Sequence, residues 1–247
     1  MGFFDGFFGP PKHPNEKAIA TQAAMLQQRH GEPARRYQAA DQLVAWGTPE
    51  AVDALLLRFS VDVASETSDE DEKEYVADLI GEKIGESAVP SLERYLRQQE
   101  QVGWPLRVLS KLLPPEDFRT RVTSILSTFD THYDRAPERK VEMIHSLMEH
   151  AKDPAVADAV RPYMADTNDT VRIAAQELLA RSGRQQDAEA LVEALVDSED
   201  RPRVKSALLV ALLDRPGAVA GRKAEVEALL PEGYYLTREG TIKRLGK

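Results

Sequence analysis

Three potential metal ligands stand within the short stretch DTHYD: Asp130, His132 and Asp134. Carboxylate and imidazole groups are common zinc ligands, so this spacing raises the possibility of a metal site. The stretch is polar and interrupts the apolar periodicity on either side, which predicts a loop between two helices. We favour a solvated polar loop over a metal centre, and we expect no metal here.

Other chemistry-bearing patterns are sparse in the sequence. His145 and Glu149 are four residues apart on an expected helix, a spacing typical of a surface hydrogen bond. Glycine-rich phosphate loops, HExxH pairs and nucleophile elbows are absent. The chain has no Cys, which excludes disulfides and thiolate catalysis. We therefore expect neither catalytic residues nor a cofactor.

Acidic residues cluster at 69–72 in the stretch SDEDE. We expect Ser68 to be the N-cap of a helix whose first turn carries these carboxylates, because anionic groups interact favourably with a helix N-terminus. A cation site or a patch for a basic partner is the alternative. The cluster does not match an EF-hand loop, because the required glycine is missing.

The net charge is −9, and no long basic run appears, so we expect no nucleic-acid partner. Local positive charge is still possible. Arg94, Arg97, Arg119 and Arg121 come from neighbouring segments and would form one positive strip for an acidic segment of a protein partner. Independent surface arginines are the simpler interpretation of the same residues. Further candidates for the same surface are Arg58, Glu93 and Arg161.

The side chains discussed above are expected to lie on or between helices. An internal repeat in the sequence predicts how these helices are arranged. NDTVRIAAQELLARSG (168–183) aligns without gaps with EPARRYQAADQLVAWG (32–47), which pairs Arg172 with Arg36 and Gly183 with Gly47. EDEKEYVADLIGEKIG (70–85) aligns too, although Gly81 stands where the others carry Leu. Each stretch ends at a glycine, which suits a left-handed turn at a helix C-terminus.

A second apolar segment follows each of these glycines. In the first case Thr48 is the expected N-cap and Pro49 the first helical residue. The unit is therefore a helical hairpin, and recurrence at roughly 33 to 38 residues predicts stacked hairpins. The remaining expected helices are 15–31, 103–113, 115–129, 137–151, 154–164, 200–214 and 220–230.

The repeat resembles the HEAT-repeat family, especially the bacterial repeats related to phycobilisome lyases. The resemblance covers roughly residues 33 to 230 and rests on Arg172, Ala175, Leu179 and Gly183 and their counterparts in the first repeat. It implies an all-α, right-handed α-solenoid of about six HEAT-like hairpins over 15–230. It also implies a protein-interaction scaffold, because most such families are scaffolds.

A minority of HEAT-like proteins are bilin lyases or DNA glycosylases, so the resemblance leaves an enzyme or ligand carrier as the alternative. No residue can be assigned to tetrapyrrole chemistry. A glycosylase would need aromatic residues on a basic face. Trp46 precedes a helix-ending glycine, where core packing is the natural role, whereas Trp104 begins a helix and is the better candidate for exposure.

The N-terminal segment 1–14 contains Phe3, Phe4, Phe7 and Phe8, which share one face of a short helix. They would cap the open end of the solenoid, or they would anchor the chain in a partner groove or at a membrane surface. The C-terminal segment 231–247 predicts a small β-hairpin or an extended tail around Glu239 and Gly240.

Taken together, these features predict a non-catalytic scaffold or adaptor that binds a protein partner on the concave face, through the Phe-rich segment, or both. The longest apolar runs are only a few residues, and the sequence contains neither Cys nor an export signal. We therefore expect a cytoplasmic protein.

Overall fold

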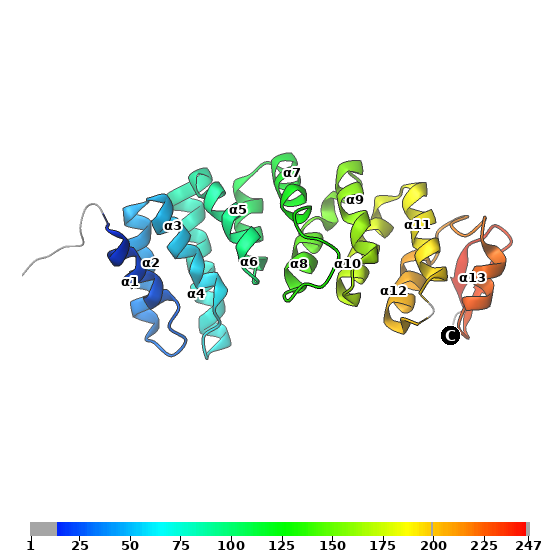
Figure 1. Cartoon of the computed structure of the whole chain (residues 1–247), viewed down its shortest axis with the longest axis horizontal. Coiled ribbons are helices and arrows are strands. Elements are labelled where there is room, and N and C mark those ends of the chain that lie inside the picture. Colours follow the sequence, from blue (N-terminus) through cyan, green and yellow to red (C-terminus); the bar gives the residue numbers. More distant parts are fainter. Residues whose placement is uncertain (1–13, 199, 246–247) are drawn as a thin grey trace, which may run out of the picture. The chain divides into compact units, whose positions relative to one another are not determined.

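The computed structural model describes residues 14–198 and 200–245. The Phe-rich stretch with Phe3, Phe4, Phe7 and Phe8 lies outside these ranges. The described chain is mostly helical, with one small two-stranded antiparallel sheet. The chain divides into two compact units, Met1–Phe118 and Arg119–Lys247. Figure 1 labels helices of both units. No helix in the described ranges has both the length and the apolar character needed to cross a bilayer.

In the first unit, helices alternate between two layers. Helix α3 contacts both α1 and α5, and α4 contacts both α2 and α6. Each helix of this unit therefore packs against the next helix but one in the sequence. The helices are α1 (Glu16–Leu26), α2 (Pro33–Trp46), α3 (Pro49–Leu56), α4 (Glu66–Leu79), α5 (Val89–Gln98) and α6 (Gly103–Leu112).

The predicted hairpin between α2 and α3 is confirmed in detail. Gly47 ends α2 in the left-handed region, with φ 62° and ψ 11°, and its N–H donates to the carbonyl of Leu43. The hydroxyl of Thr48 accepts a hydrogen bond from the Ala51 N–H, and Pro49 is the first helical residue. Gly183 ends α10 in the same way, with φ 73° and ψ 3°.

Gly85 departs from this pattern. Helix α4 passes into a π turn at Ile80–Ile84, and Gly85 follows with φ 64° and ψ −148°, outside the left-handed helical region. The aligned glycine thus also needs a positive φ, but it opens a short 3-10 turn (Gly85–Ala88) that leads into α5. Gly81 is inside the π turn, at the position where the other repeats carry leucine.

The second unit repeats the layered packing. Helix α10 contacts α8 and α12 on one layer, and α11 contacts α13 on the other. Helix α7 runs across the boundary between the units. The helices are α7 (Pro115–Leu126), α8 (Glu138–Ser146), α9 (Pro154–Val160), α10 (Asp169–Ser182), α11 (Gln185–Val196), α12 (Pro202–Leu212) and α13 (Lys223–Leu229).

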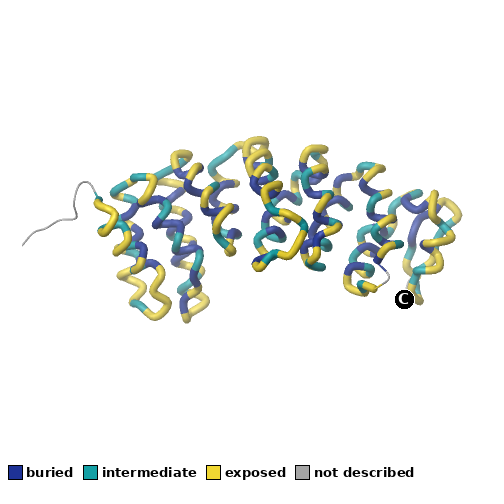
Figure 2. Tube along the Cα trace, viewed as in Figure 1, coloured by how far each residue is buried: buried dark blue, intermediate teal, exposed yellow. Residues whose placement is uncertain are grey.

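The C-terminal segment forms the predicted β-hairpin. Strands β1 (Tyr234–Leu236) and β2 (Ile242–Arg244) pair antiparallel, and Gly240 in the connecting turn has φ 78°. Ile242 is fully buried in the apolar core of α11, α12 and α13, so the hairpin closes that core. Figure 2 shows the buried positions following the inner faces of the helices within each unit.

Candidate functional site

The arginine shared by two of the three aligned stretches, 32–47 and 168–183, has a structural role. Arg36 donates to the carbonyl oxygens of Gln28 and Gly31, at 2.9 and 2.7 Å. Arg172, its counterpart, donates through Nε to the carbonyl of Asp166 in the loop before α10. Both side chains therefore tie the preceding turn to the helix they belong to. This contact explains why the repeat carries an arginine at that position.

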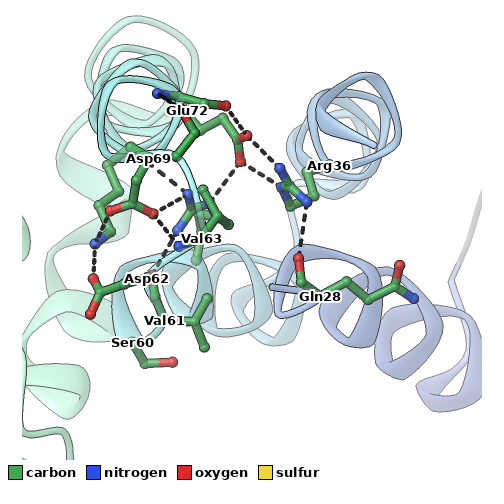
Figure 3. Close-up of polar contacts among 12 residues, drawn as sticks. Gln28, Arg36, Ser60, Val61, Asp62, Val63, Asp69 and Glu72 are labelled. Carbon is green, nitrogen blue, oxygen red and sulfur yellow. Dashed lines mark hydrogen bonds and ion pairs between the residues drawn. The ribbon is translucent and has the colours of Figure 1, made fainter. Parts of the chain in front are cut away.

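Arg36 also belongs to a buried ionic network (Figure 3). Its guanidinium makes two hydrogen bonds to Glu72, at 2.6 and 2.7 Å, and Arg58 donates to the same carboxylate at 3.1 Å. Arg58 is fully buried, and Arg36 and Glu72 are 3% and 2% exposed. The interpretation of Arg58 as a partner-binding residue is therefore wrong, because its guanidinium faces the interior.

The acidic cluster supplies the anions of this network. Asp69 binds Arg58 and Lys73, each at 2.6 Å, so it is held between two cations. The N-cap of α4 is Ser65, and the prediction of Ser68 is wrong: Ser68 is inside the first turn, and its hydroxyl hydrogen-bonds Glu72 at 3.1 Å. The helix begins earlier than predicted because Ser65 accepts the Ser68 N–H.

The network fixes the charge state of its carboxylates. Burial alone raises the pKa of Glu72, but the hydrogen bond from Arg36 and the positive charges of Arg58 and Arg36 outweigh it, so the pKa lies below its usual value. For Asp69, burial is again outweighed, here by hydrogen bonds from Lys73 and Arg58, and its pKa is also lowered. The network is therefore an ion cluster that joins α2, α4 and the 3-10 turn Leu57–Ser60.

The DTHYD stretch lies in the predicted loop between α7 and α8. Asp130 accepts the N–H of His132 at 3.0 Å, and Asp134 accepts the N–H of Ala136 at 2.9 Å. These carboxylates therefore serve the loop's own backbone. Across residues 14–198 and 200–245, no group of three or more His, Asp or Glu side chains is arranged to hold a metal ion.

A buried ion pair inside the second unit holds this loop in place. Lys140 and Asp166 are both fully buried, and Nζ lies 2.6 Å from Oδ2. Lys140 also donates to the Asp130 carbonyl at 3.2 Å. The hydroxyl of Tyr163 adds a bond to the Phe129 carbonyl at 2.7 Å. No local pattern in the sequence predicts this pair, because its members are 26 residues apart.

The predicted arginine strip is engaged in local contacts. Arg94 binds Asp53 at 2.8 Å, Arg97 lies 3.5 Å from Glu93, and Arg119 binds Asp153 at 2.6 Å. Arg121 also has an interaction partner. Arg94 and Arg97 belong to the first unit, whereas Arg119 and Arg121 belong to the second. A strip that joins all four remains a prediction.

Two other predicted contact residues are likewise occupied. Arg161 binds Asp187 at 2.5 Å and Asp158 at 3.1 Å. Trp104 is half-buried and stacks on Phe59, with the ring centroids 6.2 Å apart. Trp46 is half-buried as well. Neither tryptophan belongs to a strongly exposed aromatic surface.

A groove with a different composition lies along α10 and α12. Its volume is about 660 Å³, and three arginines line it: Arg181, Arg203 and Arg215. None of the three side chains has a hydrogen bond or ion pair to another residue in the part of the chain that the structure describes. The remaining lining residues are mostly apolar or small: Ile173, Glu177, Ala180, Ser206, Ala207, Val210 and Ala211.

Helical spacing places these residues on one face of each helix. On α10, Ile173, Glu177 and Ala180 follow the i, i+4, i+7 pattern, and on α12 Arg203, Ala207 and Val210 do the same. The core faces of both helices are made by other residues, among them Leu178 and Leu179, and Leu208 and Leu212. Val210 is 64% exposed on the groove face, whereas Ile173 and Ala180 are partly buried and also pack against the core.

Arg215 reaches the groove from the turn after α12, and the C-terminal hairpin fixes that turn. Asp214 has a left-handed φ of 59°. Its N–H donates to the Ile242 carbonyl at 3.0 Å, and its carboxylate binds Lys243 at 2.6 Å. Burial lowers the pKa of the Arg215 guanidinium, although an arginine remains charged in proteins. The C-terminal hairpin therefore also positions a groove residue.

The groove combines three guanidinium groups, which can bind anions, with apolar side chains that a bound molecule would cover. The sequence reasoning missed it. The groove lies on α10 and α12, whereas the predicted arginine strip lies on α5 and α7. The available signal was the helical spacing of Ala180, Ala207 and Val210, which are small or apolar positions beside the core residues of α10 and α12.

Comparison with protein families, curated proteins and solved structures gave no match to this chain.

Proposed function

We propose that the chain is a non-catalytic scaffold or adaptor that binds a protein partner through the groove between α10 and α12. The observation that carries the proposal is a set of three arginines around a partly apolar groove, Arg181, Arg203 and Arg215, whose side chains make no hydrogen bond or ion pair to residues 14–198 or 200–245. Most other arginines discussed above bind carboxylates of the same chain. Cations left unpaired beside exposed apolar surface are typical of binding sites for another molecule.

The proposal includes the architecture implied by the resemblance: a right-handed α-solenoid of about six HEAT-like hairpins, in a bacterial-type cytoplasm. Two observations support the stacking. The helices of the first unit contact the next helix but one, and in the second unit α8, α10 and α12 do so, as do α11 and α13, as stacked hairpins require. Arg36 and Arg172 also tie the preceding turn to their own helix at equivalent repeat positions. The Phe-rich segment is a proposed second contact.

An affinity purification of the full chain from its own cells tests the function. The groove variant carries Arg203→Glu and Val210→Glu, two exposed positions whose replacement leaves the core intact. The control carries Arg135→Glu, an exposed arginine in the loop between α7 and α8. We expect the wild-type chain and the control to retain the same partners and the groove variant to lose at least one. Retention of every partner by the groove variant would rule out this surface.

A further inference from the structure

We infer that the occupant of the groove is an acidic amphipathic helix of a partner protein. This inference rests on the proposed function and names the partner's chemistry. It combines three properties of the groove: its floor of small side chains, its unpaired arginines, and the exposed valine on one wall.

The floor favours a helix. Ala180, Ala207 and Ala211 line the groove between two helices that are in contact along its length. Small residues let a third helix approach closely and seat its side chains between the ridges of α10 and α12. The α10 residues that line the groove run from Ile173 to Arg181, so this wall is about 12 Å long. A partner helix of two turns or more would cover that wall.

The charges favour carboxylates on the partner. Arg181, Arg203 and Arg215 bring three cations, against the single carboxylate of Glu177. Glu177 Oε2 lies 4.0 Å from Nε2 of His145, so this acid faces another basic group. A guanidinium binds a carboxylate through two parallel hydrogen bonds, which fixes orientation as well as charge. The whole chain carries −9, so the groove stands out as a positive site on an acidic protein.

The apolar surface argues against a nucleic acid as the occupant. Val210 is 64% exposed beside the arginines, and Ile173 on the opposite helix lines the groove while it also packs against the core. A phosphate backbone has no apolar face to cover these side chains, whereas an amphipathic helix has one. One amphipathic helix can therefore cover the apolar side chains of the groove with one face and bind its arginines through acidic residues on the other.

A direct binding assay tests the occupant. The probes are fluorescent peptides of about 16 residues, with Leu and Ala on one helical face and Glu on the other. One control has the same composition in an order that destroys the amphipathic face, and another has Gln in place of each Glu. A single-stranded oligonucleotide is the fourth probe. Each is titrated with the full chain by fluorescence anisotropy at low and high salt.

We expect the amphipathic Glu peptide to bind and both control peptides to bind at least about tenfold more weakly. Binding should weaken with salt, because the arginines act as surface charges. Arg203→Ala and Arg181→Ala should each weaken the Glu peptide, and Arg135→Ala should leave its affinity unchanged. Circular dichroism of each variant verifies that the helices are retained.

Three results would overturn the inference. Equal binding of the reordered peptide excludes a helical occupant. Tighter binding of the oligonucleotide than of the Glu peptide, lost in the arginine variants, assigns the groove to nucleic acid. Absence of peptide binding also rejects the acidic helix. If the groove variant still loses a cellular partner in that last case, the inference fails while the proposed function stands. If it retains all partners, both fail.

Discussion

The guanidinium of Arg36 and the carboxylate of Glu72 meet in a bidentate ion pair, with distances of 2.6 and 2.7 Å, across 36 residues of sequence. Both groups are removed from solvent, and Arg58 donates to the same carboxylate. Two cations thus share one anion inside the first unit. Such a cluster is sensitive to the loss of any member, because the charges left behind have no water to solvate them.

Glu72→Gln should therefore destabilise the first unit by about 3–5 kcal/mol, since it leaves Arg36 and Arg58 buried without their shared anion. Both tryptophans of the chain, Trp46 and Trp104, lie in this unit, so tryptophan fluorescence during urea unfolding reports on it. Glu70→Gln, at an exposed position of the same cluster, is the matched control and should change stability by less than about 0.5 kcal/mol. Equal effects of the two variants would contradict the buried network.

Acid should weaken the same unit. The pKa values of Glu72 and Asp69 are lowered in the folded chain from ordinary values of 4.5 and 3.8. A lowered folded pKa contributes stability that is present above the unfolded value and is lost as pH falls through the folded value. The free energy of unfolding should thus be level near neutral pH and decline below about pH 5. Tryptophan-detected urea unfolding at several pH values measures this.

The comparison variant for the acid experiment is Glu72→Gln, which has one titrating group fewer. Its free energy of unfolding should be lower at neutral pH and should fall less steeply on acidification. Parallel curves for the variant and the wild type would show that Glu72 does not couple protonation to folding.

The glycines of the repeat lead to opposite predictions. Gly47 has φ 62°, so Gly47→Ala should destabilise the first unit by about 1–2 kcal/mol through backbone strain. Gly81 has no positive φ, and no atom lies within 4 Å of an added Cβ. Gly81→Ala should therefore stabilise the same unit by about 0.5–1 kcal/mol, because alanine loses less backbone entropy in a helical turn. The urea midpoints of the two variants, measured by tryptophan fluorescence, test this. If both substitutions change stability in the same direction, the backbone conformations assigned to Gly47 and Gly81 would be contradicted.

Local signals in the sequence were sufficient for much of the secondary structure. Thr48, Pro49 and Gly47 specify a helix boundary through contacts only a few residues long, and the hairpin around Gly240 depends on an equally short turn. The same kind of signal was ambiguous at Ser65 and Ser68, two serines within one turn. The boundary there depends on which hydroxyl accepts a backbone N–H.

The proposed binding groove could not be predicted from local sequence signals. Arg181, Arg203 and Arg215 look like ordinary surface arginines in the sequence, and the groove exists only because α10 lies against α12 and the hairpin holds the turn at Asp214. Arg58 shows the reverse case. It has the sequence context of a surface residue, yet its partner Glu72, 14 residues away, brings it into the interior.

The buried pair of Lys140 and Asp166 gives the last prediction, in the second unit. Lys140→Met leaves Asp166 as an unpaired buried anion and removes the bond to the Asp130 carbonyl, so it should cost about 3–5 kcal/mol. Adding Asp166→Asn to it removes the stranded charge and should recover part of that loss. Circular dichroism during urea unfolding gives the stabilities of the variants. In Lys140→Met, the backbone amides of residues 127–137 should also exchange their hydrogens faster, because the loop opens more readily. Lys152→Met, an exposed lysine after α8, should leave both readouts unchanged. A double variant as unstable as the single one would mean that packing, and not the unpaired charge, determines the cost.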